Sequence, residues 1–230
     1  RPWISLSKKD LKREVRTFMI FSTSAIAFAA DTDVEVVTGF TDEDFLKVKG
    51  RKMFNAKGEE VVLRGVNLGG WLVREDWLCP DHVPEGVQYD GEYVYDTLEE
   101  RFGREKAQEL LESYYENWIT EWDLDNIKSM GFNCVRVPFW YRNFYYDDKG
   151  TKILDEKGEW DFSILDWVVE ECSKRELYVI LDMHGAVGSQ SDAPHSGRAF
   201  QGAQLYEKSE RGEEYRRLTI ELWQAIAQRY

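Results

Sequence analysis

Residues 120–138, TEWDLDNIKSMGFNCVRVP, contain the pattern of one complete helix followed by one strand. Thr120 suits the N-cap of the helix, and Asp123 is placed to accept a hydrogen bond from the backbone N–H of the cap residue. Apolar residues then recur at helical spacing, at Leu124, Ile127 and Met130. Gly131 supplies the stop, because glycine tolerates the left-handed conformation that often ends a helix. The apolar run that follows is a predicted strand with Pro138 at its exit, so this stretch predicts an α/β fold.

Two further apolar runs extend the same pattern along the chain. Residues 61–63 and 178–183, together with 132–138, are predicted as buried strands. Helices are predicted over 98–131, 162–175 and about 213–230. Apolar strands that alternate with helices predict a parallel sheet covered on its outer face. The strand starts lie 71 and 46 residues apart, so only about the first three units of a (β/α)8 TIM barrel fit in 230 residues.

The N-terminal region differs in composition from the rest of the chain. Basic residues precede an apolar run at 18–28 that closes with a small-x-small pattern, so residues 1–29 are predicted as a secretory signal peptide. The alternative is an amphipathic or disordered leader. Residues 30–44 are predicted as an acidic linker, and 45–230 as the domain, which opens with a hairpin around Gly50. These features predict a secreted protein, extracellular or periplasmic, without integral membrane association.

The composition excludes some classes of partner. The formal net charge is −13 and the sequence pI is about 4.8, so the chain lacks the basic footprint of a nucleic-acid-binding protein. The three cysteines, Cys79, Cys134 and Cys172, have no CxxC spacing and favour buried thiols over a disulfide framework or zinc site. The sequence also contains no glycine-rich phosphate loop.

The segment after the first predicted strand has residue types suited to carbohydrate. It begins with Gly69 and Gly70, which allow a sharp turn, and continues with Trp71, Glu75 and Trp77. Aromatic faces stack on the C–H face of a pyranose, and carboxylates accept hydrogen bonds from sugar hydroxyls. The alternative is that the two tryptophans only pack in the core.

The other two strand ends carry charged and titratable residues. Arg136 lies inside an apolar run, so its guanidinium needs an ionised carboxylate beside it, either at a functional site or in a purely structural ion pair. Asp182 and His184 point to the same side of the third strand, and His195 follows. Contact of His184 with a sugar or a carboxylate is favoured over a metal site, because no HxH or HExxH spacing is present.

Three blocks of the sequence are similar to a known family. They are VVLRGVNLGGWLVREDWL (61–78), WITEWDLDNIKSMGFNCVRVPFWY (118–141) and LDMHGAVGSQSDAPHSGR (181–198). In order and spacing they resemble family 5 glycoside hydrolases, nearest the exo-β-1,3-glucanase-like branch. The resemblance covers roughly residues 45–230. It implies a (β/α)8 barrel that hydrolyses β-glucosidic bonds with retention, using two carboxyl groups about 5 Å apart and no cofactor or metal.

The resemblance also assigns roles to individual residues. Arg136 matches the arginine that hydrogen-bonds the nucleophile, His184 matches the histidine that lines the −1 sugar subsite, and Glu75 matches the acidic residue that grips the terminal glucose. Substrate contacts without a defined role are implied for Trp71, Tyr141 and Phe144.

The sequence departs from the family pattern in several places. The family places its acid/base in Asn-Glu-Pro after strand four and its nucleophile after strand seven. No Asn-Glu-Pro occurs here, so both catalytic carboxylates are expected beyond residue 230, and the 230-residue chain alone is expected to be inactive. Asp76, Pro194 and His195 also differ from the family pattern, which leaves the linkage open.

The leading hypothesis is therefore the N-terminal part of a secreted retaining glycosidase, with β-1,3-glucan as the favoured substrate. The alternatives are a non-catalytic sugar-binding fragment, or a glycosidase for cellulose, β-1,6-glucan, a steryl glucoside or a glycosphingolipid. Exo or endo action and the oligomeric state stay open.

Overall fold

The computed structural model describes residues 39–75, 77–79 and 90–230. The chain divides into two compact units, one up to Val62 and the other from Leu63, and each is described by itself. The predicted signal peptide, 1–29, lies outside the described residues, as does most of the predicted linker, 30–44. The predicted domain start at residue 45 stays a prediction.

The first unit contains a small antiparallel sheet. Its elements are η2 (Asp42–Asp44), β1 (Lys47–Lys49), β2 (Lys52–Phe54) and β3 (Glu60–Val61). The strands pair in the order β1-β2-β3. The turn between β1 and β2 contains Gly50 at a φ of 65°, in the left-handed region that glycine adopts without strain. The predicted hairpin at this position is confirmed.

The predicted buried strand at 61–63 is wrong. Val61 ends β3 of the antiparallel sheet, and Val62 is 56% exposed. The parallel sheet of the second unit starts instead with β4 (Gly65–Asn67). Gly65 begins this strand because a Cβ there would lie 1.8 Å from the carbonyl oxygen of Cys134 on the neighbouring strand. Gly65 thus permits a close approach of two strands.

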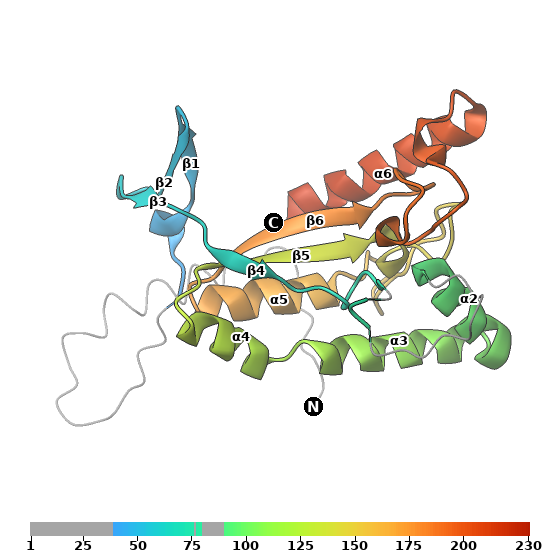
Figure 1. The fold of residues 1–230 in the computed structure, drawn as a ribbon, viewed down its shortest axis with the longest axis horizontal. Helices are drawn as coiled ribbons and strands as arrows, with labels where there is room; N and C mark the ends of the chain where they lie inside the picture. The colour runs from blue at the N-terminus through green and yellow to red at the C-terminus, as the bar shows by residue number, and fades with distance from the viewer. Residues whose placement is uncertain (1–38, 76, 80–89) are drawn as a thin grey trace. The chain divides into compact units, whose positions relative to one another are not determined.

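The second unit is built on three parallel strands, as predicted. They are β4, β5 (Cys134–Trp140) and β6 (Tyr178–Gly185), which lie side by side in chain order (Figure 1). The register places Asn67 opposite Arg136, and Arg136 opposite Ile180. Sequential neighbours that pair in parallel require crossover connections, which the helices between them provide.

Pro138 lies within β5 rather than at its exit, which corrects the sequence-based prediction. The carbonyl of Arg136 accepts the N–H of Leu68, so this side of β5 faces β4. The nitrogen of Pro138 faces the same side, because alternate residues of a strand repeat their orientation. Since β4 ends at Asn67, the proline removes no ladder hydrogen bond there.

Five α-helices are described in the second unit, namely α2 (Gly91–Phe102), α3 (Arg104–Trp118), α4 (Glu121–Ser129), α5 (Ser163–Lys174) and α6 (Glu210–Arg229). Short 3-10 turns occur at η3 (Tyr141–Asn143), η4 (Pro194–Ser196) and η5 (Gln204–Tyr206). Helix α6 thus begins a few residues before the predicted start near 213. Among the described helices, none has the length and apolarity needed to cross a bilayer.

The predicted helix at 98–131 is three helices in the structure. Gly103 separates α2 from α3 with a φ of 79°, which breaks the helical path. The predicted cap at Thr120 is confirmed, since its backbone N–H donates to the Asp123 carboxylate over 2.8 Å. Met130 does not continue the apolar stripe; it is the C-cap of α4 and is 70% exposed.

The core lies between the helices and one face of the parallel sheet. Val135, Val137 and Phe139 of β5 are fully buried on that face. They belong to one apolar cluster with Leu124 of α4, Leu165 and Val168 of α5, and Leu218 and Leu222 of α6. Because side chains alternate along a strand, Arg136 points to the opposite face, where Ile180 of β6 is 43% exposed. The sheet therefore has one apolar face and one face with polar groups.

The three cysteines are buried, as predicted. Burial raises the pKa of the Cys172 thiol to about 12. Cys172 belongs to the apolar cluster of the core, so it acts as a small hydrophobic side chain.

Helix α4 offers a direct test of this core. Leu124 has no exposed surface, so Leu124→Ala is expected to lower the free energy of unfolding by about 2–5 kcal/mol through lost burial and a cavity. Trp122→Ala on the same helix is the control, because Trp122 is 72% exposed and its loss is expected to cost within about 0.5 kcal/mol. Urea denaturation followed by circular dichroism measures both. Equal losses in the two variants would contradict the described packing of α4.

Candidate functional site

Polar side chains from all three parallel strands meet on the sheet face opposite the helices. Arg136 projects from the middle of β5, and Asn67, its register partner, ends β4. Asp182 and His184 lie two and four residues beyond Ile180, the register partner of Arg136 on β6. The two-residue period of a strand places all four side chains on one face. Function in parallel βα folds gathers at the carboxyl ends of strands, toward which this group extends.

Arg136, Asp182 and His184 form a compact cluster, called here the Arg–Asp–His cluster. The Oδ2 atom of Asp182 lies 2.5 Å from Nη2 of Arg136 and 2.8 Å from Nδ1 of His184. Nη2 of Arg136 and Nδ1 of His184 are 3.0 Å apart. The side chains of Arg136 and Asp182 are 32% and 28% exposed, so the ion pair is only partly screened by solvent.

Asn67 is the residue of this face that sequence reasoning missed. Its Oδ1 lies 3.5 Å from Nη1 of Arg136, at the outer limit of a hydrogen bond. The signal was present in the quoted block, because Asn67 occupies a strand end. Because the first strand was predicted at 61–63, the sequence did not indicate that Asn67 lies opposite Arg136. The register of β4 with β5 shows this.

The main chain around His184 is held by the loop that follows β6. Nε2 of Gln190 donates to the carbonyl of His184 over 2.6 Å, and Oε1 of Gln190 accepts the N–H of Ala186 over 2.9 Å. His195, from the same loop, places its ring centroid 5.6 Å from that of His184. No group of three or more metal-ligating side chains is found among the residues that the structure describes. The loop thus holds the main chain on both sides of the His184 imidazole.

The same loop forms hydrogen bonds with the start of α2. The carboxylate of Asp90 caps α2 by accepting the N–H of Tyr93, and its other oxygen accepts the N–H of Ala199 over 2.9 Å. The N–H of Glu92 donates to the carbonyl of Gly197 over 2.8 Å. These bonds join segments more than a hundred residues apart in sequence and fix the loop at the rim of the sheet.

Glu75 lies on the segment after β4, at the same end of the sheet. It is partly exposed, and its carbonyl accepts the N–H groups of Leu78 and Cys79, which forms a turn. Gly70, with a φ of 67°, packs closely against this turn, since a Cβ there would lie 2.9 Å from the carbonyl oxygen of Leu78. The predicted grip of Glu75 on a sugar stays a prediction.

The three aromatic residues predicted as substrate contacts lie in the core. Trp71 has no exposed surface, and its indole N–H donates to the carbonyl of Tyr115 over 2.8 Å. Phe144 is fully buried, and Tyr141 is 2% exposed. Burial raises the pKa of the Tyr141 hydroxyl above its ordinary value. In the described structure these rings belong to the buried apolar cluster of the core. Their contact with a sugar stays a prediction.

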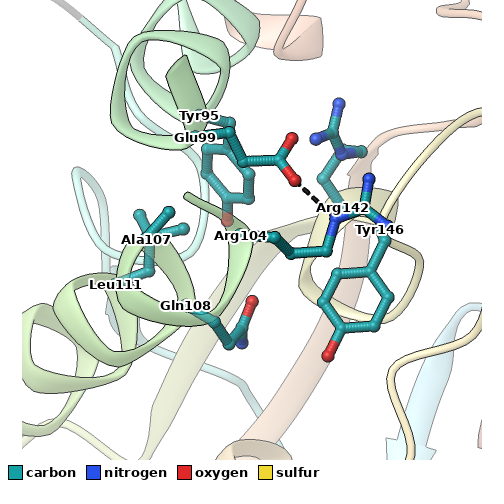
Figure 2. A pocket seen from close by; sticks show the side chains of 8 residues that line it. All are labelled: Tyr95, Glu99, Arg104, Ala107, Gln108, Leu111, Arg142 and Tyr146. Atoms are coloured by element: carbon teal, nitrogen blue, oxygen red, sulfur yellow. Dashed lines mark hydrogen bonds and ion pairs between the residues drawn. The ribbon is translucent and has the colours of Figure 1, made fainter. Parts of the chain in front are cut away.

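A separate small pocket lies where α2 meets α3 (Figure 2). Arg104 pairs with Glu99 over 2.5 Å, and its guanidinium lies over the ring of Tyr146. The guanidinium of Arg142 lies 5.3 Å from the ring centre of Tyr95. The volume of about 20 Å³ admits a water molecule and no sugar ring. Its lining contains no residue of the Arg–Asp–His cluster, so the two are separate.

Comparison with known proteins identifies what this arrangement is similar to. The model of the family described as Cellulase (glycosyl hydrolase family 5) matches residues 99–230, more than half of the chain. A beta-xylosidase from Phanerodontia chrysosporium is 34% identical over 186 residues, which are 81% of this chain and 36% of that protein. A glucan 1,3-beta-glucosidase from Lachancea kluyveri is 32% identical over 188 residues, which are 78% of this chain and 41% of that protein.

Among solved structures, a rutinosidase from Aspergillus niger matches with a TM-score of 0.47 and 20% sequence identity. The match covers 68% of this chain and 42% of the rutinosidase chain. The chain thus spans about two fifths of the length of the relatives that it matches.

The rim loop contains a matched pair of glycines that tests its packing. Gly197 and Gly202 have φ values of 82° and 78°, so alanine at either position is expected to cost about 1–2 kcal/mol of backbone strain. Only at Gly197 would the new Cβ meet a neighbour, Nε1 of Trp140 at 2.4 Å. Gly197→Ala is therefore expected to destabilise by about 1–3 kcal/mol more than Gly202→Ala in urea denaturation. Equal effects would show that Trp140 does not pack under this loop.

Proposed function

Because the chain belongs to glycosyl hydrolase family 5, the cellulase family, we propose that it forms the N-terminal part of a (β/α)8 barrel in a retaining glycosidase. The proposed substrate is a β-glucosidic bond of a glucan or glucoside, with β-1,3-glucan favoured. The observation that carries this proposal is the Arg–Asp–His cluster, which lies on the open face of three consecutive parallel strands.

The sheet supports the barrel proposal. Strands β4, β5 and β6 pair in parallel in chain order, which is the arrangement of successive strands in a (β/α)8 barrel. The described helices pack on one face, and the residues of the Arg–Asp–His cluster lie on the other. In a closed barrel that second face is the interior, and the carboxyl ends of its strands form the active site.

The free donors of Arg136 support a role beside a catalytic carboxylate. A guanidinium has five N–H donors; among the described residues, Nη2 donates one hydrogen bond to Asp182, and Nη1 donates a long one of 3.5 Å to Asn67. The partly exposed Arg136 side chain therefore retains donors for a second carboxylate. In a retaining glycosidase, the carboxylate that attacks the anomeric carbon must stay ionised, and an adjacent guanidinium favours the ionised form.

The catalytic carboxyl groups are proposed to come from barrel strands beyond residue 230. In the retaining mechanism one carboxylate attacks the anomeric carbon while a carboxylic acid protonates the leaving oxygen. Water then releases the sugar, with the second group acting as base. Arg136 holds the nucleophile, His184 contacts the sugar in the −1 subsite, and Glu75 binds hydroxyls of the same sugar.

The names of the relatives support the substrate class. The matched proteins include several glucan 1,3-beta-glucosidases and one beta-xylosidase. A glucose and a xylose ring differ by the hydroxymethyl group, so a panel of both sugars separates the two specificities. A polysaccharide substrate outside the cell would also be consistent with the secretion predicted from the N-terminal pattern.

Activity of the full-length protein tests this proposal. We expect release of glucose from laminarin, and turnover of an aryl β-glucoside that exceeds turnover of the matching aryl β-xyloside. Arg136→Lys is expected to lower kcat about 10- to 100-fold, because lysine cannot supply the forked donors that hold two carboxylates. The melting temperature is expected to change little, since partly exposed ion pairs contribute about 0–1 kcal/mol.

Arg229→Lys is the control for the effect of the substitution itself. Arg229 pairs with Asp166 between α6 and α5, away from the sheet face. Its side chain is 29% exposed, close to the 32% of Arg136. Its replacement is expected to leave kcat unchanged. Full activity of Arg136→Lys would refute the proposed role of the cluster, and binding of laminarin without any hydrolysis would favour the non-catalytic alternative.

A further inference from the structure

Three polar atoms of the Arg–Asp–His cluster form a triangle. Oδ2 of Asp182, Nη2 of Arg136 and Nδ1 of His184 lie 2.5 to 3.0 Å from one another. Each of these contacts is a hydrogen bond only if one of its two atoms donates a hydrogen and the other accepts it. The chemistry of the groups therefore decides where the proton of the imidazole lies.

The distribution of protons follows from the side-chain inventory. A guanidinium only donates, and an ionised carboxylate only accepts. Because Oδ2 of Asp182 accepts from Arg136 and lies 2.8 Å from Nδ1 of His184, Nδ1 must carry a hydrogen to bond with it. The contact between Nη2 and Nδ1 is then a contact of two donors that share one acceptor. Nδ1 is thus committed to Asp182, and Nε2 is the ring nitrogen that remains.

We propose that Asp182 is a positioning residue that holds His184 as its Nδ1–H tautomer and directs Nε2 to the substrate. This inference rests on the proposed function for the identity of the ligand. In the neutral tautomer Nε2 is an acceptor, so its partner is a free hydroxyl group of the bound sugar. The site would therefore exclude a sugar that carries a substituent on that hydroxyl, because such an oxygen has no hydrogen to donate.

The surrounding main chain strengthens this assignment. Gln190 bridges the carbonyl of His184 and the N–H of Ala186, so the backbone next to the imidazole is fixed. With the backbone held by Gln190 and one ring nitrogen held by Asp182, little rotational freedom is left to the ring. Preorganised groups of this kind bind a transition state without reorganisation at the moment of reaction.

Nitrogen NMR of the full-length protein reads the tautomer directly. The protein is labelled with 15N-histidine and measured at about pH 8.5, where imidazoles are neutral. We expect His184, assigned by comparison with His184→Gln, to show a protonated nitrogen at Nδ1 and an unprotonated nitrogen at Nε2. Asp182→Asn is expected to shift these signals, because an amide is able to donate to Nδ1 as well as to accept from it.

Kinetics on the same variants connect the tautomer to turnover. Asp182→Asn is expected to lower kcat for an aryl β-glucoside about 10- to 100-fold, the usual cost of losing a group that orients a ligand. Asp166→Asn is the matched control, because it breaks an ion pair of similar exposure on the helical side. It is expected to leave both the His184 signals and kcat unchanged.

Three results would overturn the proposal. The first is a protonated Nε2 of His184 in the unmutated protein. The second is Asp182→Asn with unchanged histidine signals and activity. The third is a loss of activity with unchanged signals, which would mean that Asp182 acts through Arg136 alone. A protein without glycosidase activity that nevertheless shows the Nδ1–H tautomer and its loss in Asp182→Asn would refute the proposed function and leave the role of Asp182 standing.

Discussion

The pairing of Arg136 with Asp182 on the open face of a parallel sheet is the interaction on which the candidate site depends. Each of the two charges is partly removed from water on this face, so each favours an oppositely charged partner beside it. The pair contributes little net stability because both partners stay partly solvated. Its value lies in geometry, since one carboxylate oxygen fixes a guanidinium from β5 and an imidazole from β6 at hydrogen-bond distance.

One face of the parallel sheet packs in the core, and the other carries the polar groups of the candidate site. On the apolar face, β5 packs against the helices through Val135, Val137 and Phe139. Arg136, between the two valines, points to the other face. The apolar face fixes the strand, and the alternation of side chains then fixes the direction of the guanidinium. The loop after β6 adds a third constraint, because its bonds to α2 hold the segment that orients His184.

The sequence predicted those features that depend on local patterns. Spacing and capping located α4 and β5, and the strand-end motifs identified Arg136 and His184. Features that depend on residues close in space but distant in sequence were not predicted. The need for Gly65 is set by the carbonyl of Cys134, some seventy residues away, and the tolerance of Pro138 is set by the end of β4. The burial of Trp71 is likewise decided by α3, whose Tyr115 carbonyl accepts its indole N–H. An aromatic residue in a sequence does not reveal whether its face meets a sugar or another side chain.

The most direct measurement is a crystal structure of the full-length protein with a fluorinated glucosyl group trapped on its nucleophile. We expect the nucleophilic carboxylate within about 3 Å of the Arg136 guanidinium, and Nε2 of His184 at a similar distance from a sugar hydroxyl. A sugar bound elsewhere on the protein, with the Arg–Asp–His cluster untouched, would show that this cluster only stabilises the sheet.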